Sequence, residues 1–290
     1  NKNYPISIYG LCQTGFYWVD FPDLLESTGL IQVQRGAGAG LIGYPSIGGS
    51  INIITSTFSD KPKMQLDASL GSFNTRKYTA SFSSGLIDNK YSVYAKISQT
   101  KSDGYRDKNW IDFKSYHVSA VRYDENVTTH LNFYGGPIAD GLTYNGLAKF
   151  AIKDRDLRKH NYSYFEADEN EYTFVVPRRD DEKENFSQPH FELLNDVKIN
   201  DALTFNSALF LVLGDGFFDY DGSWSVFLDD YFRLEENGFE VSTDPTNALI
   251  RAYVDNKQWG WIPRISWDHL NGNLILGGEL RLHKSKPNGN

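Results

Sequence analysis

After residue 62 the chain alternates apolar and polar residues with a period of two. In one segment Tyr91, Val93, Ala95 and Ile97 alternate with Ser92, Tyr94, Lys96 and Ser98. This period places successive side chains on opposite faces of an extended strand, so each segment has one apolar and one polar face. The pattern predicts nine strands, at about residues 63–71, 74–85, 90–101, 112–123, 127–136, 189–199, 203–214, 260–269 and 274–284.

The lengths of these strands and of their connections point to a particular kind of sheet. Most strands run roughly 9–12 residues, which exceeds the usual ~5–6 of soluble sheets and suits a tilted membrane-spanning strand. Short connections alternate with long ones at 102–111, 137–188 and 215–259. Outer-membrane barrels keep short periplasmic turns and long extracellular loops in this way. The sequence therefore predicts an all-β fold, a transmembrane antiparallel β-barrel.

The polar faces of the predicted strands carry many charges. We assign to them Lys77, Lys96, Lys114, Asp196, Lys198, Glu279 and Arg281. A dry core would have to pair every one of these charges, whereas a lumen filled by water or by a plug can hold them. Aromatic residues near the predicted strand ends are expected to form interfacial girdles: Tyr91, Tyr123, Tyr134, Trp261 and Trp267.

Composition excludes several other classes of protein. A net charge of -8 and a pI of about 5.3 argue against nucleic acid as a partner. Mean hydropathy is -0.47, and no apolar run approaches the roughly 18–20 residues of a membrane helix. The single cysteine, Cys12, rules out an internal disulfide framework. No catalytic constellation is found, because the six histidines are scattered and no G-x-S-x-G motif occurs, so we do not expect an enzyme.

A glycine-rich segment at 31–55 contains G-x-G-x-x-G at 38–43. A dinucleotide-binding fingerprint must open a helix, whose N-terminus holds the pyrophosphate. Here Tyr44-Pro45 and the pair Gly48-Gly49 follow, and then a β-branched run at 50–55. Proline and paired glycines destabilise the interior of a helix. The glycines are therefore interpreted as tight turns between short strands.

The same segment carries a resemblance to a known family. Gln34-Arg35-Gly36, then Gly43, then the run GGSINIIT at 48–55 closely resemble the end of the plug domain of TonB-dependent outer-membrane receptors. The stretch YWVDFPDL at 17–24 resembles the plug segment just before it. GSFNT at 71–75 and SDGY at 102–105 resemble the first barrel hairpins of Bacteroidota-type receptors. The resemblance covers about residues 5–136. Beyond them only the regular succession of predicted strands and connections supports it.

The resemblance implies a globular plug inside a 22-stranded barrel of the outer membrane of a Gram-negative-type bacterium. It implies residues 1–62 as the C-terminal part of the plug and 63–290 as the N-terminal part of the barrel, with long extracellular loops at 137–188 and 215–259. Nine strands do not close such a barrel, so we expect the chain to be partial at both ends, with any TonB box before Asn1. TonB, energised by ExbB and ExbD, would drive import of a ferric siderophore, haem, cobalamin, glycan or peptide.

Candidate site residues follow from the same resemblance. Ligand contacts are expected at two apical plug loops, from Gln13, Thr14, Phe16, Tyr17 and Trp18 in one and from Tyr44 in the other. The alternative for the aromatic residues is simple packing of plug against barrel. Arg35 is expected to anchor the plug to acidic residues of the barrel wall that lie beyond this chain. Gly36, Gly48 and Gly49 are expected to be structural.

Several further expectations concern metals, partners and rival functions. Asp219 and Asp221 are weak candidates for Ca²⁺ in an extracellular loop, but a solvated acidic loop is preferred, and no other cofactor is expected. The mixed-charge loop at 154–186 is expected to face water or lipopolysaccharide, and the barrel to contact the lipid bilayer. A surface lipoprotein or another outer-membrane subunit is a further possible partner. The rival functions are a receptor-like structural or interaction subunit of a larger outer-membrane assembly, and a soluble β-rich hydrolase with an acidic cleft.

Overall fold

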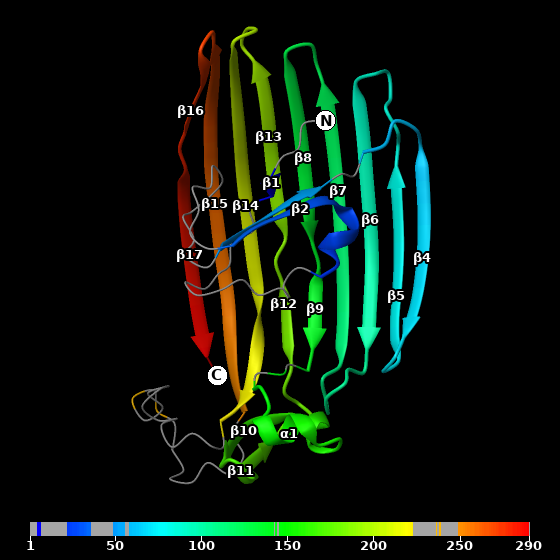
Figure 1. Ribbon diagram of the computed structural model, residues 1–290, viewed down its shortest axis with the longest axis vertical. Helices are drawn as coiled ribbons and strands as arrows, with labels where there is room; N and C mark the ends of the chain where they lie inside the picture. Colours follow the sequence, from blue (N-terminus) through cyan, green and yellow to red (C-terminus); the bar gives the residue numbers. More distant parts are fainter. Residues whose placement is uncertain are drawn as a thin grey trace.

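A broad antiparallel sheet forms the body of the protein, and a small sheet lies across one of its faces (Figure 1). The structure is a computed structural model of the 290-residue chain. It describes residues 5–6, 22–35, 49–55, 58–141, 143, 145–222, 236, 238 and 249–289. Among these residues no helix is long and apolar enough to cross a membrane.

The broad sheet, called the wall below, contains 12 strand segments. They are β4 (Lys63–Gly71), β5 (Thr75–Ser83), β6 (Tyr91–Ser102), β7 (Ile111–Tyr123), β8 (Val127–Gly135), β9 (Pro137–Asp140), β12 (Glu184–Ser187), β13 (His190–Lys198), β14 (Leu203–Asp221), β15 (Leu249–His269), β16 (Gly272–Gly277) and β17 (Leu280–Gly289). The small sheet has the order β1 (Pro5–Ile6), β3 (Gly49–Thr55), β2 (Thr28–Arg35). A hairpin of β10 (Tyr162–Ala167) and β11 (Tyr172–Pro177) stands apart, near α1 (Lys149–Lys153).

The wall segments fall into nine strand positions, because three positions are each made of two segments in line. β8 and β9 both pair with β7, β12 and β13 both pair with β14, and β16 and β17 both pair with β15. The nine predicted strands are confirmed in number and order. Each interruption falls at a glycine or proline, namely Gly136, Pro189 and Gly278. A Cβ at Gly136 would lie 1.8 Å from the carbonyl oxygen of Lys114 on β7, so only glycine fits this close approach.

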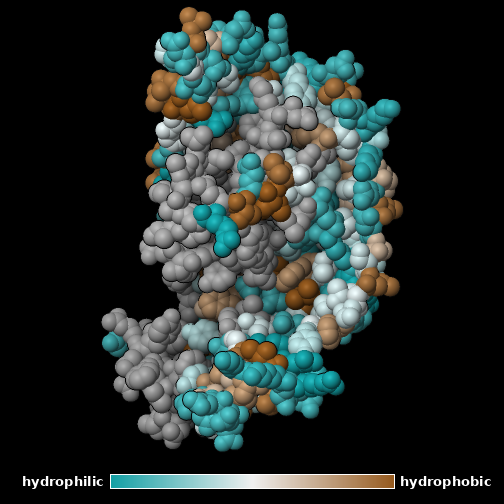
Figure 2. All heavy atoms as spheres, viewed as in Figure 1, coloured by the Kyte–Doolittle hydropathy of each residue, from teal (hydrophilic) through white to brown (hydrophobic). Residues whose placement is uncertain are grey.

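Alternation gives the wall one polar and one apolar face. The inner face, against which the small sheet lies, carries buried polar side chains such as Lys96, His117 and His190. The outer face exposes apolar ones, including Leu66, Ile97 and Leu131 at 70%, 65% and 52%. In Figure 2 apolar residues also protrude along the rim at β4 and β5. Apolar side chains facing outward over a whole sheet are the reverse of a soluble protein's arrangement.

The connections separate to opposite ends of the wall. The short turns at 86–90, 124–126, 199–202 and 270–271 lie at one end, here called the turn end. The connections that contain α1 and the β10–β11 hairpin lie at the other, the loop end (Figure 1). The predicted alternation of short and long connections is therefore present in space as well as along the chain.

Three details of the sequence interpretation are wrong. The segments 137–188 and 215–259 are not loops throughout, because β9 and β12 lie in the first and the ends of β14 and β15 in the second. Lys114 belongs to the outer face, since it is exposed and two residues from Tyr116 and four from exposed Val118. Tyr134 is not an interfacial aromatic, because it is 2% exposed on the inner face.

The interruption at Gly136 yields a test of the wall. The substitution Gly136→Ala should lower the free energy of unfolding by about 1–3 kcal/mol, since the added methyl group forces β9 away from the Lys114 carbonyl. Denaturant unfolding followed by tryptophan fluorescence measures the change. Gly146→Ala is the control, because a Cβ there meets nothing within 4 Å and the change should stay within about 0.5 kcal/mol. Equal effects of the two substitutions would contradict the steric account.

Candidate functional site

A short turn brings the N-terminal segment against the inner face of the wall. Pro22 and Asp23 lead into a 3-10 turn, η2 (Leu24–Ser27), which runs directly into β2. Asp23 has φ of 59°, in the left-handed region that aspartate and asparagine tolerate better than most residues. This conformation, together with the single turn of η2, directs the carboxylates of Asp23 and Glu26 toward the same part of the wall.

Two lysines of the wall receive these carboxylates. Lys77 on β5 forms ion pairs with both Asp23 and Glu26. Lys96 on β6 donates a hydrogen bond to the backbone carbonyl of Asp23, and its ammonium lies 3.4 Å from Asp23 Oδ2. A further contact of 3.4 Å joins Ser27 Oγ and the Tyr94 hydroxyl, also on β6. We call the four charged residues Asp23, Glu26, Lys77 and Lys96 the docking cluster.

Burial decides which of these contacts matters most. The side chain of Lys96 is 1% exposed and that of Asp23 is 6%, whereas Lys77 and Glu26 are 26% and 35% exposed. Solvent screens the outer pair, so its net contribution is small. The inner pair is shielded, and removing one member would leave a buried charge without compensation, at a cost of roughly 3–5 kcal/mol. The Asp23–Lys96 pair is therefore the principal electrostatic link between segment and wall.

An aromatic row continues from the docking cluster along the inner face. The rings of Tyr94 and His117 are 5.6 Å apart, those of His117 and Tyr134 are 5.8 Å apart, and Tyr134 stacks on His190 at 4.8 Å. The Tyr134 hydroxyl donates to Glu192 at 2.9 Å. These polar-tipped rings fill the inner face without presenting an apolar surface, as a wall that faces a polar interior requires.

All six predicted ligand contacts lie outside the described residues. These are Gln13, Thr14, Phe16, Tyr17, Trp18 and Tyr44, together with the structural glycines Gly36 and Gly48. Arg35 ends β2, is exposed and is in register with Gly49, the first residue of β3. No ion pair of Arg35 occurs within the part of the chain that the structure describes, so its anchoring role stays a prediction. The docking cluster was not predicted, because its charges come from segments about 50 to 70 residues apart.

The acidic residues considered for Ca²⁺ are not in a solvated loop. Asp219 and Asp221 lie in β14 and are 0% and 4% exposed. Arg251 on β15 binds Asp219 with two hydrogen bonds, of 2.7 and 2.9 Å, and stacks over Phe217 with its guanidinium carbon 3.8 Å from the ring centre. Among the described residues no group of three or more acidic, histidine or cysteine side chains is placed to hold a metal ion.

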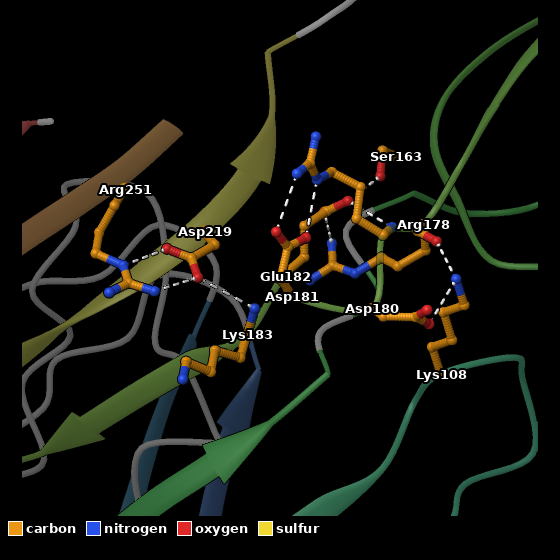
Figure 3. A network of polar contacts seen from close by, with 10 residues as sticks. Lys108, Ser163, Arg178, Asp180, Asp181, Glu182, Lys183, Asp219 and Arg251 are labelled. Carbon is orange, nitrogen blue, oxygen red and sulfur yellow. Dashed lines mark hydrogen bonds and ion pairs between the residues drawn. The ribbon is translucent and has the colours of Figure 1, made fainter. Parts of the chain in front are cut away.

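A second polar cluster ties the loop end together (Figure 3). Arg178 and Glu182 form an ion pair at 2.8 Å, and their side chains are only 1% and 0% exposed. Glu182 also accepts hydrogen bonds of 2.8 Å from the Ser163 hydroxyl and from the Arg179 backbone N–H. We call Lys108, Ser163, Arg178, Glu182, Asp219 and Arg251 the loop-end network. The expectation that the whole segment 154–186 faces solvent is wrong at Arg178 and Glu182.

The loop-end network connects four separate parts of the chain: the connection between β6 and β7, the segment 163–183, β14 and β15. Lys108, from the connection between β6 and β7, donates to the Arg178 carbonyl at 2.6 Å. The backbone N–H of Asp219 on β14 donates to the Lys183 carbonyl at 2.9 Å. Next to it, Arg179 binds Asp181 with two hydrogen bonds of 2.9 Å, which lower the pKa of Asp181 below its ordinary value. Lys108 and Asp219 thus bind the backbone of the segment 178–183 at two points. This segment follows β11 directly, so these contacts fix the base of the β10–β11 hairpin.

Comparison with known proteins identifies the fold. No family model matches the sequence, and no curated protein matches it either. Among solved structures, the ferric-catecholate import receptor Fiu of E. coli K12 in its open form matches with a TM-score of 0.61 at 16% identity, over 90% of this chain and 40% of Fiu. The ferric preacinetobactin receptor BauA of Acinetobacter baumannii matches at 0.66 and 13%, over 91% and 37%. The outer-membrane ferripyoverdine receptor of Pseudomonas aeruginosa matches at 0.66 and 10%, over 91% and 33%.

The chain has the fold of these siderophore receptors. The prediction of an all-β fold of the receptor-barrel type is confirmed at the level of the fold. The chain spans 40% or less of the length of the three receptors named above. The similarity runs over about nine-tenths of this chain. Within this receptor fold the docking cluster lies where the N-terminal part meets the wall.

Neutralising Asp23 tests the docking cluster. Asp23→Asn keeps a residue that tolerates positive φ but leaves Lys96 buried without its counter-ion. We expect the free energy of unfolding to fall by roughly 3–5 kcal/mol, and the N-terminal segment to become more sensitive to protease. Asp67→Asn on exposed β4 is the matched control, with an expected change within about 0.5 kcal/mol. Equal stability of the two variants would show that the pair does not hold the segment.

The buried pair of the loop-end network is tested in the same manner. Glu182→Gln removes the charge opposite buried Arg178, and we expect local stability to fall by roughly 3–5 kcal/mol. Hydrogen exchange of the backbone amides in β10 and β11 should then accelerate. Asp180→Asn is the control, because Asp180 is 92% exposed and its pair with Lys108 contributes only about 0–1 kcal/mol. Unchanged exchange in Glu182→Gln would mean that the network does not support the hairpin.

Proposed function

We propose that this protein is an outer-membrane receptor that binds a scarce extracellular solute and imports it with energy supplied by TonB. One observation carries the proposal: the fold matches solved receptors and transporters of ferric complexes over 89–91% of the chain. The outward apolar face of the wall supports a location in the outer membrane. A ferric siderophore is the solute class we favour, since the matched receptors take up ferric complexes.

The contacts of the docking cluster are compatible with movement of the N-terminal segment away from the wall during import. Ion pairs and hydrogen bonds to a wall can be exchanged for water, whereas apolar packing cannot be broken without exposing apolar surface. At the docking cluster the inner face carries Lys77, Lys96 and the polar-tipped ring of Tyr94, although aliphatic side chains such as Val121 and Leu194 are buried elsewhere on this face. A segment held in this way can leave the wall at a moderate free-energy cost, and it returns to a defined position because two carboxylates meet two lysines.

Uptake by cells tests the proposal. The full-length protein is expressed in a Gram-negative strain deleted for its own siderophore receptors, and uptake of ⁵⁵Fe from catecholate, hydroxamate and citrate complexes is measured with and without a protonophore. We expect energy-dependent uptake of at least one complex and binding that survives the protonophore. Binding without uptake would favour the structural or interaction role, and neither binding nor uptake of any complex would remove the siderophore assignment.

The predicted apical aromatic residues provide a residue-level test. Tyr44→Ala and Trp18→Ala should each weaken binding of the transported complex by roughly 2- to 10-fold, since a stacked ring contributes about 0.5–1.5 kcal/mol beyond its buried area. Tyr44→Phe is the matched control and should retain the stacking contribution. The dissociation constants are measured by quenching of intrinsic fluorescence in detergent. Equal affinities of Tyr44→Ala and Tyr44→Phe would place the ligand elsewhere.

A further inference from the structure

His117, on the inner face of β7, lies directly beside the docking cluster. It is the cross-strand partner of Lys96 on β6, and such partners on one face of a sheet are about 5 Å apart. Pro22 and Ser27 of the N-terminal segment line the same small cavity, of about 10 Å³, as Lys96 and His117. The imidazole therefore faces both the buried lysine of the cluster and the segment that the cluster holds.

The ring of His117 is enclosed without a hydrogen-bond partner. The residue is 1% exposed, and neither ring nitrogen makes a hydrogen bond within the part of the chain that the structure describes. Asn132 on β8 lies nearby, but its amide already binds the Ser119 hydroxyl and Glu192. An uncharged imidazole tolerates these surroundings, whereas a charged one would lack the partners that a buried ion requires.

The charges that face His117 are already balanced. In the docking cluster two cations, Lys77 and Lys96, are paired with two carboxylates. The other titratable groups around the ring, on β6, β8 and β13, are Tyr94, His130, Tyr134, His190 and Glu192. Only Glu192 among them is acidic, and it lies two strand positions away and accepts hydrogen bonds from Tyr134 and Asn132. A proton on His117 would therefore add a third cation beside Lys96 and compete with it for the carboxylates.

This arrangement links docking of the N-terminal segment to pH. While the segment is docked, a proton on His117 is opposed by burial and by the neighbouring ammonium group. After the segment has left the wall, water reaches the ring, and an accessible histidine takes up a proton with a pKa of about 6.5. The released state thus binds one more proton than the docked state. Docking is therefore favoured at pH values above about 6.5 and weakens as the pH falls below this value.

We infer that His117 makes the docking cluster a pH switch, which holds the N-terminal segment on the wall at neutral pH and releases it in acid. The inference concerns only the contact between segment and wall, so it does not depend on the import of any solute. Protonation of Asp23 and Glu26 is a separate event at lower pH, because carboxylates in water titrate near pH 4.

Hydrogen exchange of the full-length protein in detergent measures the switch. The backbone amides of residues 23–28 report the opening equilibrium of the segment, after correction for the intrinsic dependence of exchange on pH. The opening constant of the wild type should rise roughly 10-fold between pH 7.5 and pH 5.5, as expected for one histidine that titrates only when the segment is released. In His117→Gln, whose side chain stays uncharged, this rise should be absent. His283→Gln is the matched control, because His283 is exposed on β17 far from the cluster, and it should show the full rise.

Three results would overturn the inference: an unchanged opening constant in the wild type, a full rise in His117→Gln, or a rise that begins only below about pH 5. The last result would assign the effect to the carboxylates. Exchange of amides in β14 and β15 reports whether the wall stays intact. If His117→Gln disturbs the wall, His117→Phe replaces it as the uncharged variant, because it keeps a ring between Tyr94 and Tyr134.

Discussion

The structure depends on one constraint: every backbone N–H and C=O group of the wall must find its partner on a neighbouring strand. This requirement is strictest where the surroundings offer no water. The interior strands of the wall meet it over long stretches, including 19 residues in β14 and 21 in β15, whereas β4 at one edge and β16 and β17 at the other pair on one side only among the described residues. Pro263 shows how an exception is handled. It lacks an N–H, and the neighbouring strand is interrupted beside it, with the Gly278 N–H donating to the Pro263 carbonyl at 3.1 Å.

Lateral pairing in turn fixes the direction of every side chain. Once a strand is in register, its residues alternate between the outer face and the inner face of the wall, and a shift by one residue would exchange the two. A chain with a mean hydropathy of only -0.47 can therefore present an apolar exterior, because half of its strand residues are polar and face inward. The inner face then needs polar contacts of its own, and the docking cluster and the aromatic row supply them.

These relations explain what the sequence predicts well and what it does not. Period-two alternation reveals the nine strand positions, because it is a local property of each strand. The alternation does not show which side chains face inward where apolar residues occur at both odd and even positions of a strand. In β7, Phe113 and His117 alternate with Lys114 and Tyr116, and this led to the wrong face for Lys114. The ion pair of Asp23 with Lys96 joins residues 73 positions apart, and no local pattern predicts such a pair.

The loop end shows how a charged sequence can be either solvated or structural. The run Arg178-Arg179-Asp180-Asp181-Glu182-Lys183 has the composition of an exposed loop, yet Glu182 is 0% exposed and Asp180 is 92% exposed. The difference arises from Lys108 and Asp219, which hold the backbone of this run from two sides. The buried carboxylate of Glu182 pairs with Arg178 and accepts hydrogen bonds from Ser163 and Arg179, and these contacts fix the base of the β10–β11 hairpin. A fixed base lowers the entropy lost when loops close on a ligand. In the proposed receptor, the charges of this run would keep the loop end in place rather than contact the solute.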